Sequence, residues 1–181
     1  MNFVIPVRSN LELRRIMEID AEKFFKVTDK NRHNLRKWLP WVDNNVAVDD
    51  TRKYIQTCIE KIDKQEGLEL GIWYEGQWVG TIGFHAWNKS ARNACIGYWL
   101  SEDFQGKGIM RDAVRSLIKY GFEQMKLNRI EILCAVENAK SRAIPESLQF
   151  TKEGVSRQSQ WLYDHFVDLV IYSLLVEEWK G

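Results

Sequence analysis

The spacing of apolar residues in the first third of the chain predicts one strand followed by helices. Apolar and polar residues alternate weakly over 11–16, which is typical of a half-buried strand. Helical spacing follows over 20–31, where Asp20 is expected to cap the helix, and a shorter helix is expected to end before Pro40. A third helix is predicted from Asp49 or Asp50 to about residue 65, with its apolar residues on one face.

The rest of the chain alternates between strand-like and helix-like segments. Residues 68–74 and 78–84 read as strands, and Glu75-Gly76-Gln77 between them is typical of a hairpin turn. Further strands are expected at 94–100, 130–136, 153–162 and 166–176. A long amphipathic helix is predicted over 109–125, and a shorter one over 138–148, interrupted near Pro145. This order predicts an α+β fold with a mixed, mostly antiparallel sheet flanked by helices.

Length and charge exclude several classes of protein. With 181 residues, the chain is expected to form a single domain, residues 1–181. Its 26 basic and 25 acidic residues nearly balance, so the net charge gives no reason to expect nucleic acid or an anionic membrane as a partner. No apolar run is long enough to span a membrane, and the first residues lack the features of a signal peptide.

The cysteines and histidines predict neither a disulfide nor a metal site. Cys58, Cys95 and Cys134 have no CxxC spacing, and each lies in an apolar segment. We therefore expect reduced core residues in a cytoplasmic protein. The three histidines do not follow a metal-ligand spacing either, so no metal is expected.

The segment from Gln105 to Met110 is the strongest candidate for ligand binding. It follows the apolar run 96–100, which is typical of a buried strand, and it opens the predicted helix 109–125. A loop between a strand and a helix presents free backbone N–H groups and the positive end of the helix dipole to an anion. Gly106 and Gly108 let a phosphate approach the backbone closely. The segment therefore predicts a site for a phosphorylated ligand.

Other phosphate-binding loops fit this segment poorly. The nucleotide P-loop requires GxxxxGK[ST], and no serine or threonine follows here in that register. The dinucleotide-binding fold requires GxGxxG early in a βαβ repeat, whereas the run from Gly106 to Arg111 lacks the third glycine and comes late in a mostly antiparallel pattern. A helix-start turn without a ligand is the alternative for a bare GxG.

The sequence around the loop resembles the GNAT superfamily of N-acetyltransferases. Two runs carry the resemblance, IGYWLSEDFQGKGIM and ENAKSRAIPESLQF. The superfamily motif Q/R-x-x-G-x-G/A is matched by Gln105 and Gly108, and Met110 replaces its final small residue. That replacement is frequent in the RimJ/RimL-like branch, the ribosomal-protein N-terminal acetyltransferases. The branch pattern is also matched, with Gln149 in place of a glycine, by Asn138, Ser141, Leu148, Phe150, Glu153 and Gly154.

The resemblance implies acetyl-CoA as co-substrate, together with the GNAT acyl-CoA N-acyltransferase fold. Backbone N–H groups and two basic side chains would hold the pyrophosphate, namely those of Gln105, Gly106, Lys107, Gly108, Ile109, Met110 and Arg111. The backbone of Trp99 and Leu100 would pair with pantetheine and direct one N–H at the thioester carbonyl. Asn138 would hydrogen-bond the pantetheine arm. Solvated surface is the alternative for the two basic side chains.

The same resemblance suggests a general acid but leaves the general base open. Ser141, one helical turn after Asn138, resembles the residue that protonates the leaving thiolate. Relatives often carry a glutamate base where this chain has Cys95 or Gln160, and neither of these is a credible base at neutral pH. His85, at the end of a predicted strand, is the best replacement by its ordinary pKa. A purely structural role is the alternative for both Ser141 and His85.

The missing carboxylates also bear on the acceptor. A lysine amine with a pKa of about 10.4 is roughly 0.1% neutral near pH 7.5, whereas an α-amine with a pKa of about 8 is roughly a quarter neutral. A weak base therefore favours the N-terminal α-amine of a protein, ribosomal in this branch. A polyamine or other small amine is the alternative acceptor, with Glu18, Asp20 and Glu22 as the acidic cluster near the first helix. A CoA-binding protein without catalysis is the alternative from a different class.

Four aromatic residues match places where relatives bind substrate or shape the acceptor groove: Trp38, Trp41, Trp161 and Tyr163. Apolar packing is the alternative role of each. Dimers are common among relatives, so a homodimer is compatible with the sequence, although nothing in the sequence demands one.

Overall fold

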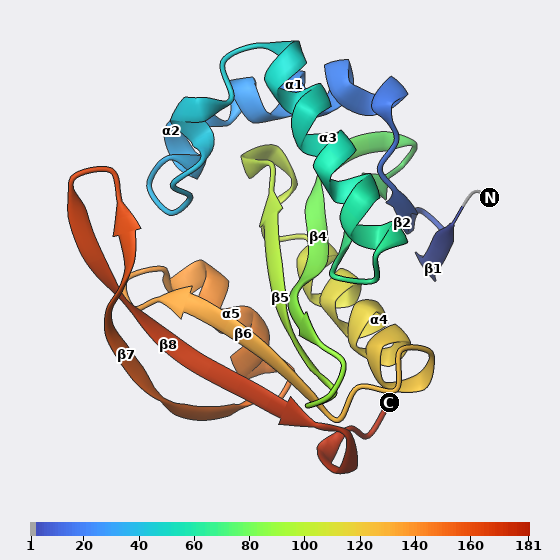
Figure 1. The fold of residues 1–181 in the computed structure, drawn as a ribbon, viewed down its shortest axis with the longest axis vertical. Helices are drawn as coiled ribbons and strands as arrows, with labels where there is room; N and C mark the ends of the chain where they lie inside the picture. Colours follow the sequence, from blue (N-terminus) through green and yellow to red (C-terminus); the bar gives the residue numbers. More distant parts are fainter. Residues whose placement is uncertain (1–2) are drawn as a thin grey trace.

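The strands of the computed structural model, which describes residues 3–181, form one eight-stranded sheet in the order β1-β2-β3-β4-β5-β6-β8-β7 (Figure 1). Neighbouring strands are antiparallel except β5 and β6, which are parallel. The mixed, mostly antiparallel sheet expected of an α+β fold is confirmed. The strands are β1 (Val4–Arg8), β2 (Leu11–Arg15), β3 (Leu68–Tyr74), β4 (Gln77–Asn88), β5 (Asn93–Leu100), β6 (Arg129–Ala135), β7 (Thr151–Leu162) and β8 (His165–Leu175).

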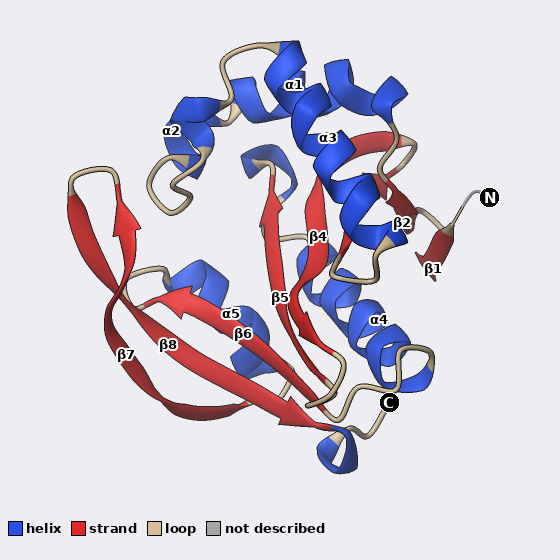
Figure 2. Ribbon diagram, in the orientation of Figure 1, coloured by secondary structure: helices blue, strands red, loops and turns tan. Residues whose placement is uncertain are grey.

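Helices cover both faces of this sheet (Figure 2). One face carries α1 (Ala21–Lys30), α2 (Arg32–Leu35) and α3 (Val48–Asp63), and the other carries α4 (Ile109–Glu123) and α5 (Ala139–Ser147). The larger core cluster lies under α4, whose predicted apolar stripe is buried: Met110, Ala113, Val114, Leu117, Ile118, Gly121 and Phe122. The smaller cluster lies under α1 and α3 and is rich in aromatic residues: Phe24, Trp73, Trp78 and Trp99. Alternation along the strands assigns neighbouring residues to opposite faces.

The sequence pattern does not predict β1, because Pro6 interrupts its alternation. β1 is the edge strand of the sheet and pairs only with β2, through Pro6 and Glu12 among other residues. A proline is tolerated there, since its missing N–H is not needed by a second neighbouring strand.

The predicted helix caps also need correction. α3 begins at Val48, and Asp50 lies inside its first turn, where its carboxylate accepts the N–H groups of Val46 and Ala47 at 3.1 and 3.0 Å. Asp20 occupies the N-cap position of α1, as predicted, but its carboxylate accepts the N–H of Met17 at 3.1 Å and makes no hydrogen bond to the first turn of α1. Both carboxylates still lie at a helix N-terminus, where the helix dipole favours a negative charge.

α5 runs without interruption through Pro145, where the sequence predicts a break. A proline inside a helix removes the N–H that would bond the carbonyl one turn earlier, which here belongs to Ser141. That carbonyl instead accepts the hydroxyl of Tyr98, on β5, at 2.8 Å. The tertiary hydrogen bond replaces the missing helical one, so α5 continues.

β5 and β6 pair over only three residues, and the candidate site lies where they part. The pairs are Asn93 with Arg129, Ala94 with Ile130, and Cys95 with Glu131. Beyond Cys95, β5 continues along β4 while β6 follows β8, and the two strands diverge (Figure 1). The backbone edge from Ile96 to Leu100 is therefore left without a strand partner in the middle of the sheet.

We expect Gly121→Val to lower the free energy of unfolding by about 1–3 kcal/mol through overpacking under α4. A Cβ at Gly121 would lie 2.7 Å from Cζ of Phe84 and 3.1 Å from Cδ1 of Ile130. Urea denaturation of the two proteins measures the change. The matched control is Gly154→Val on β7, where an added Cβ meets nothing within 4 Å. Equal stabilities for the two variants would contradict the close packing of α4.

Candidate functional site

The loop before α4 has the features of an anion site. Gly106 and Gly108 both have a φ of 73°, in the left-handed region that favours glycine. Gly108 is the N-cap of α4, and no side chain of residues 3–181 caps the first turn of that helix. A Cβ at Gly106 would meet no atom within 4 Å, so the space beside the loop is open. The first N–H groups of α4 therefore remain available as donors to a ligand.

Gln105 fixes the start of this loop between β5 and α5. Its Nε2 donates to the carbonyl of Leu100 at 3.3 Å, and its Oε1 accepts from Nζ of Lys140 at 3.0 Å. Lys107 and Arg111, the predicted basic residues, are exposed beside the loop. Lys140 is a third basic residue at this place, and the sequence does not single it out because it belongs to another helix.

The unpaired edge of β5 presents backbone groups to the opening beside β6. The carbonyl of Trp99 is turned toward β4, since a Cβ on Gly80 would lie 2.2 Å from it. Ser101 faces the same way, donating its N–H to the carbonyl of Val79 at 2.8 Å. Because the backbone groups of successive strand residues point to alternate sides, those of Tyr98 and Leu100 face the opening. Trp99 itself is buried, with 8% of its surface exposed.

Ser141, Tyr98 and Cys134 form a polar cluster on the α4/α5 face of the opening. Ser141 Oγ lies 3.2 Å from Sγ of Cys134 and 3.3 Å from Oη of Tyr98, so its hydroxyl contacts side chains rather than the local backbone. Burial raises the pKa of the Cys134 thiol and of the Tyr98 phenol, so both are protonated at neutral pH. The cluster consists of neutral proton donors.

Asn138 caps α5 and keeps a free donor. Its Oδ1 accepts the N–H of Ser141 at 3.1 Å, which fixes the first turn of the helix. Its Nδ2 has no hydrogen-bond partner among residues 3–181, so this group remains available to a ligand in the opening.

His85 lies on the opposite face, level with the point where β5 and β6 part. It pairs across the strands with Cys95, and its Nε2 lies 2.9 Å from the place that a Cβ on Gly97 would occupy. Burial, with a smaller contribution from Lys61, lowers the pKa of the imidazole. Burial raises the pKa of Cys95 to about 12, so this thiol stays protonated at neutral pH.

The turn of the β7–β8 hairpin is bridged to the segment that follows α2. Tyr163 Oη donates to the carbonyl of Leu39 at 2.7 Å, and Gln160 Nε2 donates to the carbonyl of Trp38 at 3.3 Å. The guanidinium of Arg36 lies 4.0 Å from the centre of the Tyr163 ring. Gln160 thus makes a structural contact where relatives often carry a base.

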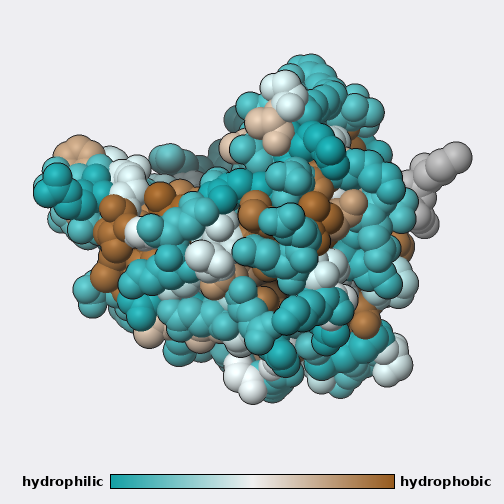
Figure 3. Space-filling view, turned by 90° about the horizontal axis from the view of Figure 1, so that it is seen from below, coloured by the Kyte–Doolittle hydropathy of each residue, from teal (hydrophilic) through white to brown (hydrophobic). Residues whose placement is uncertain are grey.

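The aromatic residues predicted for the acceptor groove differ in exposure. Trp161 is 51% exposed, and its ring meets that of Phe166 edge-on at 4.7 Å between centroids. Phe166 is 56% exposed, and the sequence does not single it out. Trp38 and Trp41 are half-buried, and the Trp41 ring lies 6.4 Å from that of Trp99. Apolar residues gather at the left of the space-filling view, the side on which β7 and β8 lie (Figure 3).

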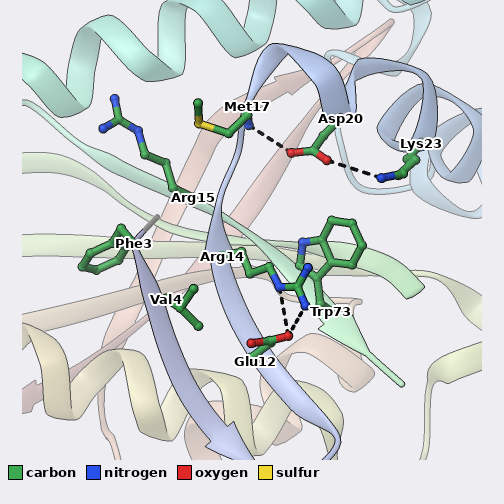
Figure 4. A pocket seen from close by; sticks show the side chains of 9 residues that line it. All are labelled: Phe3, Val4, Glu12, Arg14, Arg15, Met17, Asp20, Lys23 and Trp73. Atoms are coloured by element: carbon green, nitrogen blue, oxygen red, sulfur yellow. Dashed lines mark hydrogen bonds and ion pairs between the residues drawn. The ribbon is translucent and has the colours of Figure 1, made fainter. Parts of the chain in front are cut away.

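A cavity of about 370 Å³ lies at the other edge of the sheet, beside β1 and β2 (Figure 4). In this cavity Arg14 lies over the ring of Trp73 at 4.5 Å and pairs with Glu12. Lys23 pairs with Asp20 at 3.8 Å. Arg15, the third basic residue of the cavity, pairs with Asp63 at 3.1 Å. All three basic groups already have carboxylate partners, so the loop before α4 remains the better anion site.

Among residues 3–181, no group of three or more His, Cys, Asp or Glu side chains is arranged to hold a metal ion. Within the same range, no helix combines the length and the hydrophobicity that crossing a bilayer requires.

Comparison with known proteins identifies the family. Residues 10–151 match the family model described as "Acetyltransferase (GNAT) domain". The chain is 38% identical to YdaF of Bacillus subtilis (strain 168), over 99% of this chain and 98% of that relative.

Two solved structures share the fold and hold the coenzyme. One is RimL, a ribosomal L7/L12 alpha-N-protein acetyltransferase in complex with coenzyme A, which is joined to a cysteine by a disulfide. It has a TM-score of 0.94 and 29% identity, over 97% of this chain and 99% of that one. The other is the microcin C7 self immunity acetyltransferase MccE in complex with acetyl-CoA and AMP, with a TM-score of 0.90 and 30% identity, over 94% of each chain. The protein therefore belongs to the GNAT family of N-acetyltransferases, within its RimJ/RimL-like branch.

Proposed function

We propose that this acetyl-CoA-dependent N-acetyltransferase acts on the N-terminal α-amine of a protein, with a ribosomal protein as the first candidate. The observation that carries the proposal is the lack of a carboxylate at either usual base position. Cys95 has a pKa of about 12, and Gln160 is hydrogen-bonded to the backbone of Trp38. A protein α-amine is far more often neutral than a lysine amine, so it needs the weaker base. RimL, whose fold this chain shares, is itself an alpha-N-protein acetyltransferase.

The donor is expected to lie along the loop and the free edge of β5. The uncapped first turn of α4 and the open space at Gly106 suit a pyrophosphate, with Lys140 close by. The backbone groups of Tyr98 and Leu100 that face the opening suit a pantetheine arm, with one N–H directed at the thioester carbonyl. The free Nδ2 of Asn138 is a further donor to that arm.

We place the coenzyme sulfur beside Cys134 and Ser141. The coenzyme of RimL is bonded to a cysteine, and Cys134 is the cysteine of this chain that contacts Ser141 and Tyr98. In the transfer, the amine nitrogen bonds to the thioester carbon and the carbon–sulfur bond breaks. The leaving thiolate then takes a proton from the Ser141 hydroxyl, which water restores. The reaction is proposed to take place in the cytoplasm, in keeping with three free cysteines.

A small amine is the second candidate acceptor. The observation that favours it is the MccE structure, in which AMP is bound together with acetyl-CoA. A polyamine has less support, because Asp20 is buried and bonded to the N–H of Met17, which leaves Glu18 and Glu22 as the exposed carboxylates of that cluster. Membership of an enzyme family makes a non-catalytic CoA-binding protein the weakest alternative.

The acceptor is tested with two peptides of one ribosomal N-terminal sequence that contains a lysine. One has a free α-amine and the other an acetylated α-amine. We expect the free peptide to turn over about 100-fold faster, because the pKa values of the two amines differ by about two units. Release of CoA thiol gives the rate, and mass spectrometry gives the modified position. Comparable turnover of the two peptides contradicts the α-amine proposal, and faster turnover of a polyamine supports the alternative.

We expect Ser141→Ala to lower kcat about 100-fold with little change in the KM for acetyl-CoA, because the leaving thiolate loses its proton donor. The matched control is Cys134→Ala, which removes one of the two side chains that contact the same hydroxyl. Steady-state kinetics and thermal unfolding of both variants separate catalysis from packing. Equal kcat losses in the two variants would indicate a packing role for Ser141.

We expect Lys140→Ala to raise the KM for acetyl-CoA about three- to tenfold, which corresponds to about 0.7–1.4 kcal/mol. The substitution removes a positive charge and frees Gln105 at the start of the loop. Because the charge is exposed, the effect is expected to shrink at high salt. Lys152→Ala, another exposed lysine but on β7, is the control. An unchanged KM in Lys140→Ala removes this lysine from the coenzyme site.

A further inference from the structure

Glu69, on β3, is a buried carboxylate whose Oε2 lacks a hydrogen bond. Its side chain is 7% exposed, and Oε2 has no hydrogen-bond partner among residues 3–181. The basic group nearest to that oxygen is the imidazole of His85, whose Nε2 lies 3.4 Å away. The His85 side chain is 48% exposed, so the pair joins a buried acid to a solvent-facing base. Burial of a carboxylate without full pairing is costly, and such groups are concentrated at functional sites.

Two glycines make room for this pair on the sheet. A Cβ on Gly83 would lie 2.5 Å from Oε2 of Glu69, and a Cβ on Gly97 would lie 2.9 Å from Nε2 of His85. Gly83 faces Glu69 on one side and Gly97 on the other in the strand register. The imidazole therefore lies over the residue pair just beyond Cys95, where β5 leaves β6. This is the face of the sheet opposite Tyr98 and its partner Ser141.

We propose that Glu69 and His85 act together as the base of the transfer, with His85 contacting the acceptor amine and Glu69 as its positioning residue. The inference rests on the proposed function and names the proton acceptor of that same site. In the proposal, the Nε2–H of His85 bonds to Glu69 Oε2, 3.4 Å away, when the acceptor amine binds, and this bond fixes the tautomer. Nδ1 makes no hydrogen bond with residues 3–181. It then carries the free lone pair that can accept a proton.

The proton path follows from this tautomer. As the amine nitrogen bonds to the thioester carbon, its proton passes to Nδ1 of His85, and the Glu69 carboxylate stabilises the imidazolium that forms. The carbon–sulfur bond breaks, and the sulfur is protonated from Ser141 on the other face. The imidazolium then releases the proton taken from the amine to water, on its solvent-exposed side. Base and acid thus stay on opposite faces and do not neutralise each other.

The surroundings of the pair determine its pH dependence. Burial raises the pKa of Glu69 to about 7, with smaller lowering effects from Thr81 and Lys61. Tyr54 and Cys58 of α3 also face Glu69, and burial raises the pKa of each, for Cys58 to about 12. Below pH 7 Glu69 carries a proton, so it neither accepts the Nε2–H of His85 nor stabilises an imidazolium. As the pH rises through about 7 the carboxylate forms, so kcat is expected to rise to a plateau.

The test is the pH dependence of kcat for the α-amine peptide in Glu69→Gln, His85→Gln and the double variant. We expect Glu69→Gln to lower kcat about 10- to 100-fold and to remove the rise near pH 7, with the KM for acetyl-CoA unchanged. His85→Gln is expected to lower kcat at least as far. The double variant should match His85→Gln alone, because the two residues act as a unit. Glu66→Gln, an exposed carboxylate just before β3, is the matched control.

Thermal unfolding separates catalysis from folding. Glu69→Gln is expected to unfold at the same or a higher temperature, because it removes a buried carboxylate with an unsatisfied oxygen. If Glu69→Gln unfolds at a lower temperature and its kcat still rises near pH 7, Glu69 has only a structural role and the inference is overturned. A wild-type pH profile in His85→Gln overturns it too, while the peptide comparison can still support the α-amine acceptor. Equal turnover of the lysine amine and the α-amine by the wild-type enzyme contradicts the proposed function, whatever these variants show.

Discussion

The short parallel pairing of β5 with β6 is the constraint on which the rest of the site depends. After three residue pairs the strands diverge, and the backbone of Ile96–Leu100 loses its neighbour on one side. Backbone N–H and C=O groups inside a protein need partners. A sheet interrupted in its middle therefore calls for a strand-like ligand, and the amide groups of a pantetheine arm can pair with that edge as a strand would. The loop before α4, at the end of the same edge, is the site that we propose for its phosphates.

The pleat of β5 then separates the two halves of the chemistry. Side chains on alternate residues point to opposite faces. Tyr98 is directed to the face that carries α5, where it contacts Ser141. Gly97 has no side chain on the other face, and the ring of His85 occupies the space where its Cβ would lie. One residue step along one strand is thus enough to keep the proposed proton donor and the proposed proton acceptor apart, with the unpaired backbone edge between them.

Patterns local in the chain predicted most of the fold, and they also locate the donor side of the proposed site. The stripe of α4 and the glycine loop are readable because their residues are neighbours in sequence. Lys140 and Glu69 are not, because their relevance comes from residues 35 and 16 positions away, Gln105 and His85. In the alternation of β3, Glu69 reads as a residue of the solvent face, and only the packing of α3 over that face buries it. The continuity of α5 could not be predicted for the same reason, because it depends on a hydrogen bond from Tyr98, which is distant in the sequence.

The hydrogen bond from Tyr98 to the Ser141 carbonyl links that continuity to catalysis. A proline inside a helix costs about 3 kcal/mol, and one hydrogen bond returns only about 1 kcal/mol, so Pro145 remains a net cost within α5. The bond also commits the phenolic proton of Tyr98 to the carbonyl. Tyr98 Oη then meets Ser141 Oγ as an acceptor only, and the Cys134 thiol is a weak acceptor. A thiolate formed beside Ser141 is a stronger acceptor than either of them, so in the proposed reaction the serine proton turns toward it as the carbon–sulfur bond breaks.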